Sequence, residues 1–504
     1  MNKTLNTVTR TAGLLLLIMI LAGTAHFGTY SQQADASGPI DWTYDSGVGE
    51  TVQNVNPITV DLDADGDKEI IMFSYVNNPP PIRPDGKIYI FKSDGQQLNA
   101  NWPKSMQDIL PISIAAGDVN GDGVKDIAVH SKLGNSAFLD NQIRFFDING
   151  VQIGGMIDFG PDDESQGGLV LADMYPSLPG LEIVIPLFHQ VAGPASVRIY
   201  RFDGTLIQSY TIDHRIRSSI AVGDLDTNGT LDIVGQLYAD DAQALNGSFY
   251  VISQGNVTYY PATMNPYDVT LADLNNDGLL EIILPGRYRD SSGEPVGTIA
   301  VFNLLGTELW RRDTVKDLNF AMLHEATVYR SNLLSSPKIF LRGLDYDIPV
   351  EKIFGFESNG SDMPGWPILV DQFHNPAATH FVFVTTFDFW NTPTSKTNVL
   401  LSSRTPAFVK PYETRVNGWG LDGSMSSGFP IPLATDAVDP FSSGEVILDD
   451  LGQTNNVQLI TLESYFTPER IFRLKVQTVG YEGGGKGWPM ARHDERRTAN
   501  FNSI

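Results

Sequence analysis

Four nine-residue segments of the chain carry oxygen-bearing side chains at matching positions. Each has Asp, Asn or Glu at positions 1, 3, 5 and 9 and glycine at position 6. The segments are DLDADGDKE at 61–69, DVNGDGVKD at 118–126, DLDTNGTLD at 224–232 and DLNNDGLLE at 273–281. A hard cation such as Ca²⁺ is held by about six to eight oxygen atoms, and a short chain segment can supply them only by turning sharply. The pattern therefore predicts calcium-binding loops, about four in number.

The other positions of these segments fit the same chemistry. Glycine at position 6 permits the reversal of the backbone, and position 7 can contribute its main-chain carbonyl oxygen. The residues at position 7, which are the candidate carbonyl ligands, are Asp67, Val124, Thr230 and Leu279.

These segments differ from the loops of EF-hands. An EF-hand loop closes with a bidentate glutamate at position 12, where this chain has Met72, Val129, Gly235 and Leu284. A short apolar, largely β-branched run follows each segment and predicts a buried strand rather than a helix. The strands and the long spacing also argue against a dockerin module. The alternative is that the segments are ordinary acidic turns without a metal, since Asp, Asn and Gly are common turn residues.

The segments belong to a longer repeat. A fifth copy at 173–182 has an extra residue and two prolines, which indicates the same turn without a competent metal site. A glycine turn follows each first aspartate by about 32 residues, as expected of a repeated hairpin unit; these glycines are Gly95, Gly150, Gly204, Gly255 and Gly306. Similar turns at Gly360, Gly423 and Gly483 place further loops near Tyr329, Asp388 and Asp450.

A third landmark supports the same count of repeats. An aromatic residue followed by proline stands a few residues beyond several turns, at 102–103, 366–367, 429–430 and 488–489. The sequence thus predicts eight repeats of roughly 50–60 residues, four of them with good metal loops.

Together the acidic loop, the following strand, the hairpin glycine and the Trp-Pro pair resemble the FG-GAP/VCBS repeats, which form the β-propeller heads of integrin α subunits. The resemblance implies an all-β fold, a β-propeller of eight four-stranded blades, in one domain over 37–504. Seven blades would result if a late repeat is an insertion or if the two termini share a blade. We expect the segment Trp42-Thr43-Tyr44 to close the ring beside the last repeat.

The resemblance also implies which side chains bind Ca²⁺. By that match the ligands are Asp61, Asp63, Asp65 and Glu69; Asp118, Asn120, Asp122 and Asp126; Asp224, Asp226, Asn228 and Asp232; and Asp273, Asn275, Asp277 and Glu281.

The N-terminus predicts export. Lys3 and Arg10 precede an apolar core at 12–22, and small residues allow cleavage after Ala25 or Ala36, so 1–36 is typical of a signal peptide. An uncleaved anchor is the alternative, although the apolar core is shorter than the ~20 residues of a spanning helix. We therefore expect a secreted protein, extracellular or at the cell surface, with the periplasm as another location and with no membrane span in the mature chain.

Composition excludes several functions. The chain has no cysteine, which excludes disulfides, thiol catalysis and zinc-thiolate sites. The formal net charge of −25 makes nucleic acid and anionic membranes poor partners.

No catalytic motif emerges from the sequence. There is no His-Glu-x-x-His, and the glycine-rich stretch at 480–486 has Gly487 where a phosphate loop needs Ser or Thr. We therefore expect a monomeric binding or adhesion module for an extracellular glycan or protein. The aromatic stretches 381–390 and 406–419 are candidate ligand-binding segments, or else irregular blade edges. The alternatives are a polysaccharide lyase or hydrolase built on a calcium-bearing propeller, and a scaffold within a surface complex.

Overall fold

The computed structural model describes most of the chain beyond the N-terminal segment. The described residues are 40–52, 57–76, 85–107, 109–133, 141–160, 163–165, 168–189, 194–237, 248–316, 326–332, 334–345, 350–371, 384–392, 395–404, 414–434, 441–442, 446–465, 471–482, 494, 498 and 500. The chain divides into the units Met1–Ala36 and Ser37–Ile504, and the fold below is that of the second unit. The predicted signal peptide and the Trp-Pro pair at 488–489 lie outside the described residues.

Regular structure in this part of the chain is entirely β, and none of it is a helix able to cross a membrane. Three sheets come first along the chain. The first has β2 (Glu50–Thr51), β3 (Ile58–Val60), β4 (Glu69–Val76), β5 (Asp85–Phe91) and β6 (Lys104–Met106). The second has β7 (Ile109–Gly117), β8 (Asp126–Leu133), β9 (Asn141–Phe146) and β10 (Gln152–Asp158). The third has β11 (Asp163–Glu164), β12 (Val170–Ala172), β13 (Glu182–His189), β14 (Ala195–Tyr200) and β15 (Leu206–Ile212).

Three similar sheets follow. The fourth has β16 (Ile216–Gly223), β17 (Asp232–Leu237), β18 (Ser248–Ser253) and β19 (Asn256–Pro261). The fifth has β20 (Asn265–Pro266), β21 (Thr270–Ala272), β22 (Glu281–Arg289), β23 (Pro295–Phe302) and β24 (Glu308–Lys316). The sixth has β25 (Thr327–Tyr329), β26 (Lys338–Asp345), β27 (Val350–Glu357) and β28 (Ile368–Asp371).

The last sheet is nine-stranded and holds two such groups. One group is β29 (Thr385–Thr392), β30 (Ser395–Arg404), β31 (Thr414–Trp419) and β32 (Ile431–Ala434). The other is β33 (Phe441–Ser442), β34 (Ile447–Asp449), β35 (Asn456–Tyr465), β36 (Ile471–Glu482) and β1 (Ile40–Asp45). Two residue pairs of β29 and β36 join the groups. The described strands thus form seven continuous sheets, which become eight blade-like groups when the nine-stranded sheet is divided at that junction.

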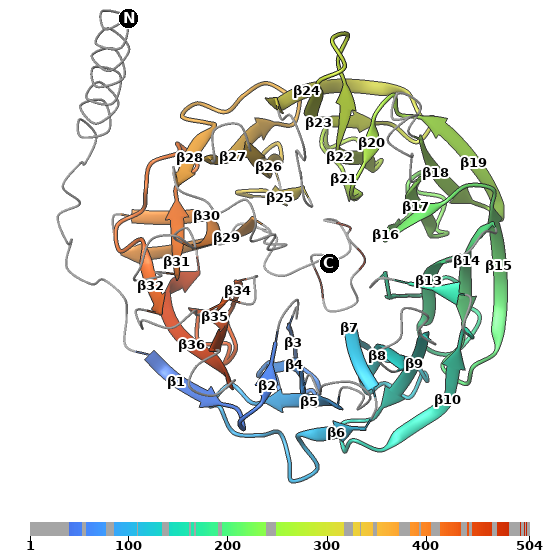
Figure 1. The fold of residues 1–504 in the computed structure, drawn as a ribbon, viewed down its shortest axis with the longest axis vertical. Coiled ribbons are helices and arrows are strands. Elements are labelled where there is room, and N and C mark those ends of the chain that lie inside the picture. The colour runs from blue at the N-terminus through green and yellow to red at the C-terminus, as the bar shows by residue number, and fades with distance from the viewer. Residues whose placement is uncertain are drawn as a thin grey trace, which may run out of the picture. The chain divides into compact units, whose positions relative to one another are not determined.

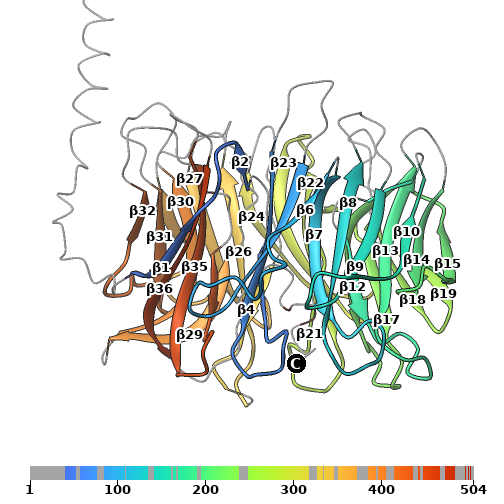
Figure 2. The ribbon, with the colours of Figure 1, turned by 90° about the horizontal axis from the view of Figure 1, so that it is seen from below.

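The groups stand around a common centre (Figure 1), with their strands running roughly along the axis of the ring (Figure 2). Sequential antiparallel sheets arranged in this way are the blades of a β-propeller. The predicted all-β propeller is confirmed, and we call the groups blades 1 to 8 in chain order.

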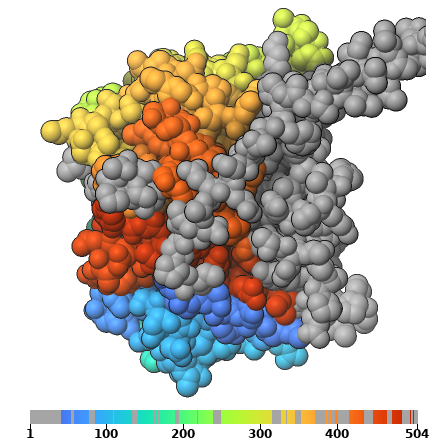
Figure 3. Space-filling model, turned by 90° about the vertical axis from the view of Figure 1, so that its left-hand side faces the viewer, coloured from blue at the N-terminus to red at the C-terminus, as the bar shows by residue number. Residues whose placement is uncertain are grey.

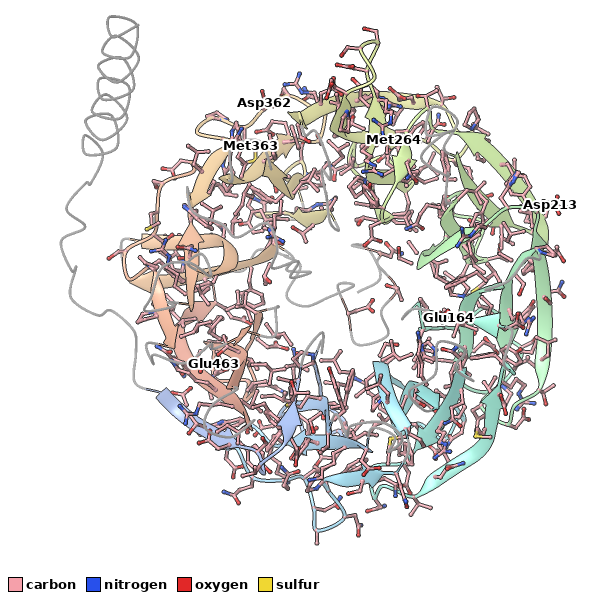
Figure 4. The ribbon with its side chains drawn as sticks, in the orientation of Figure 1. Glu164, Asp213, Met264, Asp362, Met363 and Glu463 are labelled. Carbon is pink, nitrogen blue, oxygen red and sulfur yellow. The ribbon has the colours of Figure 1, made fainter. Side chains whose placement is uncertain are left out.

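Burial explains why the sequence patterns differ between strands of one blade. The middle strands are packed on both faces, so β4 has an apolar run over residues 70–73 and its first six residues are buried. The outermost strands face solvent on one side, so β10 and β15 alternate between exposed and partly buried residues. Figure 4 shows the exposed side chains of Asp213 and Asp362 at the outer rim, whereas Met264 and Met363 are buried within blades.

Tryptophan side chains connect neighbouring blades. Each donates its indole N–H to a main-chain oxygen in the hairpin turn of the next blade, over 2.8–2.9 Å. The donor and acceptor pairs are Trp42 with Ser93, Trp102 with Ile148, Trp310 with Ser358, and Trp366 with Leu421. Two of the aromatic landmarks of the sequence, Trp102 and Trp366, therefore contact the hairpin turn of the next blade, and Trp42 and Trp310 make the same contact without a following proline.

The ring is closed by the N-terminal strand. Strand β1 pairs antiparallel with β36 and so completes the blade formed by the C-terminal strands. Trp42 on β1 then contacts the turn of blade 1 as Trp102 contacts that of blade 2. Figure 3 shows the first and last described strands, in blue and red, side by side at this seam. The expected closing role of this segment is confirmed.

The hairpin glycines lie in turns, as predicted. The loop predicted near Asp388 is not found there. The seven described turn glycines, from Gly95 to Gly423, all have positive φ, a backbone conformation that suits glycine. Asp388, by contrast, is inside β29, so the loop predicted near it is wrong. Blade 7 connects its first two strands by a short hairpin, and the spacing of the other repeats does not apply there.

Gly95→Ala should destabilise the fold more than Gly255→Ala. Both glycines have φ near +80°, at +85° and +80°, so both substitutions carry similar backbone strain. A Cβ on Gly95 would lie 2.7 Å from the ring of Trp42, whereas a Cβ on Gly255 meets nothing within 4 Å. We expect the free energy of unfolding to fall by about 1 kcal/mol for Gly255→Ala and by about 2–3 kcal/mol for Gly95→Ala, measured by denaturant unfolding. Equal losses would show that the aromatic contact adds nothing to the strain.

Candidate metal centres

Each acidic nonapeptide links the innermost strand of its blade to the second strand. We call 61–69 loop 1, 118–126 loop 2, 224–232 loop 4 and 273–281 loop 5, after their blades. Position 1 follows the end of the inner strand, and position 9 is the first residue of the second strand. The loop is thus held at both ends by an antiparallel ladder, as between β16 and β17.

One hydrogen-bond pattern recurs in all four loops. The side chain at position 3 accepts the N–H of position 5, and the side chain at position 5 accepts the N–H of position 7. The carboxylate at position 9 accepts the N–H of position 2, which is Leu62, Leu225 or Leu274 in three of the loops. In loops 2, 4 and 5 the aspartate at position 1 also accepts the N–H groups of positions 5 and 6. The predicted site residues are therefore gathered locally, four sets on four blades.

The backbone needs glycine at position 6. There Gly66, Gly123, Gly229 and Gly278 all have φ between +85° and +99°. A Cβ on Gly123, Gly229 or Gly278 would meet no atom within 4 Å, so their conformation rather than the available space requires glycine.

The carboxylates at position 9 are buried beside other carboxylates. Glu69, Asp126, Asp232 and Glu281 are at most 4% exposed. Burial raises the pKa of Glu69 to about 7, with Asp63, Asp65 and Asp61 adding to the rise and the Leu62 N–H opposing it. Burial likewise raises the pKa of Asp126 and of Glu281 to about 7. Without a bound cation, the negatively charged form of these position 9 carboxylates is therefore unfavourable.

The residues fit a bound calcium ion. All side-chain donors at positions 1, 3, 5 and 9 are oxygens, which Ca²⁺ prefers. Three buried carboxylate oxygens, Asp61 Oδ1, Asp126 Oδ2 and Asp232 Oδ1, have no hydrogen-bond partner among the described residues. A buried carboxylate oxygen without a partner is costly, and a cation would satisfy it.

Two further loops show which positions are structural. In loop 8, at 450–458, Gln458 replaces the acid at position 9, yet its amide oxygen still accepts the Leu451 N–H at 2.9 Å. Asp450 accepts the N–H groups of Thr454 and Asn455, and Asn455 adopts the positive φ of position 6. In the copy at 173–182 Glu182 accepts the Tyr175 N–H. Positions 1 and 9 therefore hold the turn even where positions 3 and 5 lack acids.

Sequence reasoning missed the contact between loop 1 and loop 8. The Lys68 N–H donates to Leu451 O at 2.6 Å, and the Lys68 ammonium pairs with Asp449 at 2.6 Å. The amide of Gln453 also donates to Gly66 O. These loops are far apart in the chain and meet only because the ring closes, so no local signal could have paired them.

Residues 61–129 match the model of the FG-GAP-like repeat, from the first residue of loop 1 into strand β8. This segment is an FG-GAP-like repeat. It contains the acidic loops of the first two blades, and loops 4 and 5 repeat their hydrogen bonds. The resemblance read from the loops is thus confirmed in this segment.

Comparison with known proteins adds little beyond the fold. No curated protein matches the chain. Among solved structures, the Dos1 propeller is 10% identical, covers 90% of this chain and 98% of its own, and has a TM-score of 0.48. The exotype rhamnogalacturonan lyase YesX is also 10% identical, with 88% and 92% covered and a TM-score of 0.40. No activity is transferred from either protein to this chain.

Stability of the metal-free protein should fall as the pH rises towards neutrality. The pKa of Glu69 rises from 4.5 in the unfolded chain to about 7 in the folded chain, so the folded state binds more protons between these values. The stabilisation is complete below the unfolded pKa and is lost as the pH passes the folded pKa. In excess chelator we expect the melting temperature to decline from pH 5 to pH 7.5, and in saturating Ca²⁺ this decline should disappear. A chelated protein that gains stability over this range would contradict the assignment.

Proposed function

We propose that this protein is a secreted β-propeller that binds Ca²⁺ in loops 1, 2, 4 and 5 and binds a glycan or protein outside the cell. The observation that carries the calcium proposal is the packing of carboxylates in loops 1 and 4. In each, three carboxylate oxygens lie within 4.8 Å of one another. Like charges so close repel strongly unless a cation lies between them.

The location follows from the same chemistry. Calcium loops of extracellular modules bind with Kd on the order of 10⁻⁴–10⁻³ M, which suits calcium at about 1 mM outside the cell. The predicted signal peptide supports export, and a chain without cysteine has no thiol to oxidise there. Bound calcium then takes the stabilising role that disulfides have in many secreted domains.

Binding is preferred to catalysis because the acidic clusters are used in the loops and the sequence has no recognised catalytic motif. The proposed ligand surface needs one revision. Phe389 and Trp419, in the two aromatic stretches, are 0% and 4% exposed. They belong to the cores of blades 6 to 8 and are not available to a ligand. Phe387 and Trp390 in the first stretch are partly buried, and residues 381–383 and 406–413 lie outside the described residues.

The ligand proposal is tested with the purified mature protein and a panel of acidic and neutral polysaccharides, in calcium and in chelator. The two measurements are retention of the protein and the appearance of new reducing or unsaturated ends. We expect retention without cleavage, and weaker retention in chelator. Cleavage would replace the binding proposal by an enzymatic one. Loss of all retention, together with no extracellular protein captured in a pull-down, would overturn it.

A further inference from the structure

The four acidic loops differ at position 3. Loops 1 and 4 have aspartate there, Asp63 and Asp226, whereas loops 2 and 5 have asparagine, Asn120 and Asn275. This single difference changes what the side chain does, because an amide can donate a hydrogen bond and a carboxylate cannot.

In loops 1 and 4 the carboxylates converge, and position 3 offers no side-chain amide to donate a hydrogen bond to them. Asp61, Asp63 and Asp65 bring three carboxylate oxygens within 4.8 Å of one another, as do Asp224, Asp226 and Asp232 in loop 4. These are the two such groups of acidic or metal-ligating side chains found within the described residues. Each also contains a buried oxygen without a hydrogen-bond partner, Asp61 Oδ1 or Asp232 Oδ1.

In loops 2 and 5 the asparagine amide donates a hydrogen bond to a neighbouring carboxylate. Asn120 Nδ2 donates to Asp122 Oδ2 at 3.0 Å, and Asn275 Nδ2 donates to Glu281 Oε1 at 2.9 Å. A cation that uses these oxygens must first displace that hydrogen bond. In loop 5 the other oxygen of Glu281 accepts the Leu274 N–H at 2.7 Å, so this buried acid is satisfied by the protein itself. Loop 2 is intermediate, because Asp126 Oδ2 still has no partner.

We propose that the loops form two classes of calcium site, with loops 1 and 4 binding at least about tenfold more tightly than loops 2 and 5. The proposal rests on the proposed function, that these loops bind Ca²⁺. Its physical basis is the position of the amide and the hydrogen bond that it makes, because loops 2, 4 and 5 each have three carboxylates among their proposed ligands and loop 1 has four. Affinity in such loops is set by ligand charge and rigidity. At intermediate calcium concentrations the protein then holds two ions.

Contacts with the C-terminal part of the chain lie beside loops of both classes. Loop 1 contacts loop 8 across the seam through Lys68. Loop 4 begins two residues after Val222, whose N–H donates to Thr498 O near the C-terminus at 3.0 Å. Asn500 likewise pairs with Leu271, two residues before loop 5.

The test is a calcium titration of the full mature protein after removal of bound metal, by calorimetry and by equilibrium dialysis. Asn275→Asp and Asn120→Asp each remove the amide donor and add a carboxylate, so each should move one site from the weak class to the tight class. Asp226→Asn and Asp63→Asn should each move one site the other way, by about tenfold in Kd. Asn276→Asp is the matched control, because it adds the same charge to loop 5 at an exposed position outside the proposed ligands.

The outcomes separate the two proposals. Two tight and two weak sites, with a gain for Asn275→Asp and none for Asn276→Asp, support the two classes. Four equal sites, or equal gains from both loop 5 variants, would overturn the two classes while leaving calcium binding intact. No calcium uptake by the wild-type protein would overturn the proposed function itself. Each variant is checked for an unchanged circular dichroism spectrum in saturating calcium.

Discussion

Removal of calcium at pH 7.5 is expected to lower the melting temperature of the mature protein by several degrees. With Kd on the order of 10⁻⁴–10⁻³ M, each site at about 1 mM Ca²⁺ stabilises the folded state by roughly 0.4–1.4 kcal/mol. Four sites then contribute about 2–6 kcal/mol, comparable with the whole net stability of ~5–15 kcal/mol of a typical domain. The measurement is a thermal melt in excess chelator and in calcium.

Two comparisons make this result specific. Re-addition of calcium should restore the melting temperature, whereas the same ionic strength of a sodium salt should not. The variant carrying both Asp63→Asn and Asp226→Asn should show a smaller response to chelator than the wild type, because its two best-formed acidic clusters are weakened. A melting temperature that ignores chelator would refute the stabilising role of calcium.

Trp42→Ala is expected to lower the free energy of unfolding by about 2 kcal/mol and to loosen the contact between the last blade and the first. Trp42 is partly buried, packs beside the ring of Phe91 at 5.9 Å, and donates its indole N–H to Ser93 O. Full burial of Trp is worth about 3–5 kcal/mol on truncation to alanine, and partial burial reduces this value. Trp42 joins β1 of the last blade to the turn of the first blade, so β1 should exchange its amide hydrogens faster in the variant.

Trp310→Ala is the matched control for this prediction. Trp310 is also partly buried, and it donates to Ser358 O at 2.9 Å in the turn of the next blade. Blades 5 and 6 are consecutive in the chain, however, so the loss of this contact should leave exchange at β1 and β36 unchanged. Equal protection of β1 in both variants would show that Trp42 does not secure the closure.

Local features of the fold were predictable because they depend on local backbone geometry. The acidic loops, the following strands and the turn glycines are each defined within about ten residues, where glycine and β-branched residues have strong preferences. The loop predicted near Asp388 was wrong because this repeat lacks those local residues. In a repeat without the acidic loop residues, the prediction relies only on the distance in sequence to the hairpin glycine. That distance does not determine where a strand ends.

Contacts between distant segments were not predictable. Glu50 illustrates this, because it is 2% exposed and accepts hydrogen bonds from Ser74, Lys87 and Tyr89. Nothing in the neighbouring sequence marks these four residues as a buried network. They come together because strands β2, β4 and β5 of blade 1 lie side by side in the sheet.

The amino-acid order alone specified which segments can surround a cation, since ligand type, spacing and the turn at position 6 are all local properties. It also specified an all-β repeat architecture, because strand and turn signals recur at a regular interval. Folding of the whole ring was needed to place loop 1 against loop 8, to seat Trp42 on the turn of blade 1, and to show which carboxylates converge and which accept an asparagine amide. The reason is that side-chain direction and long-range packing depend on neighbours that the chain brings together only when the blades assemble.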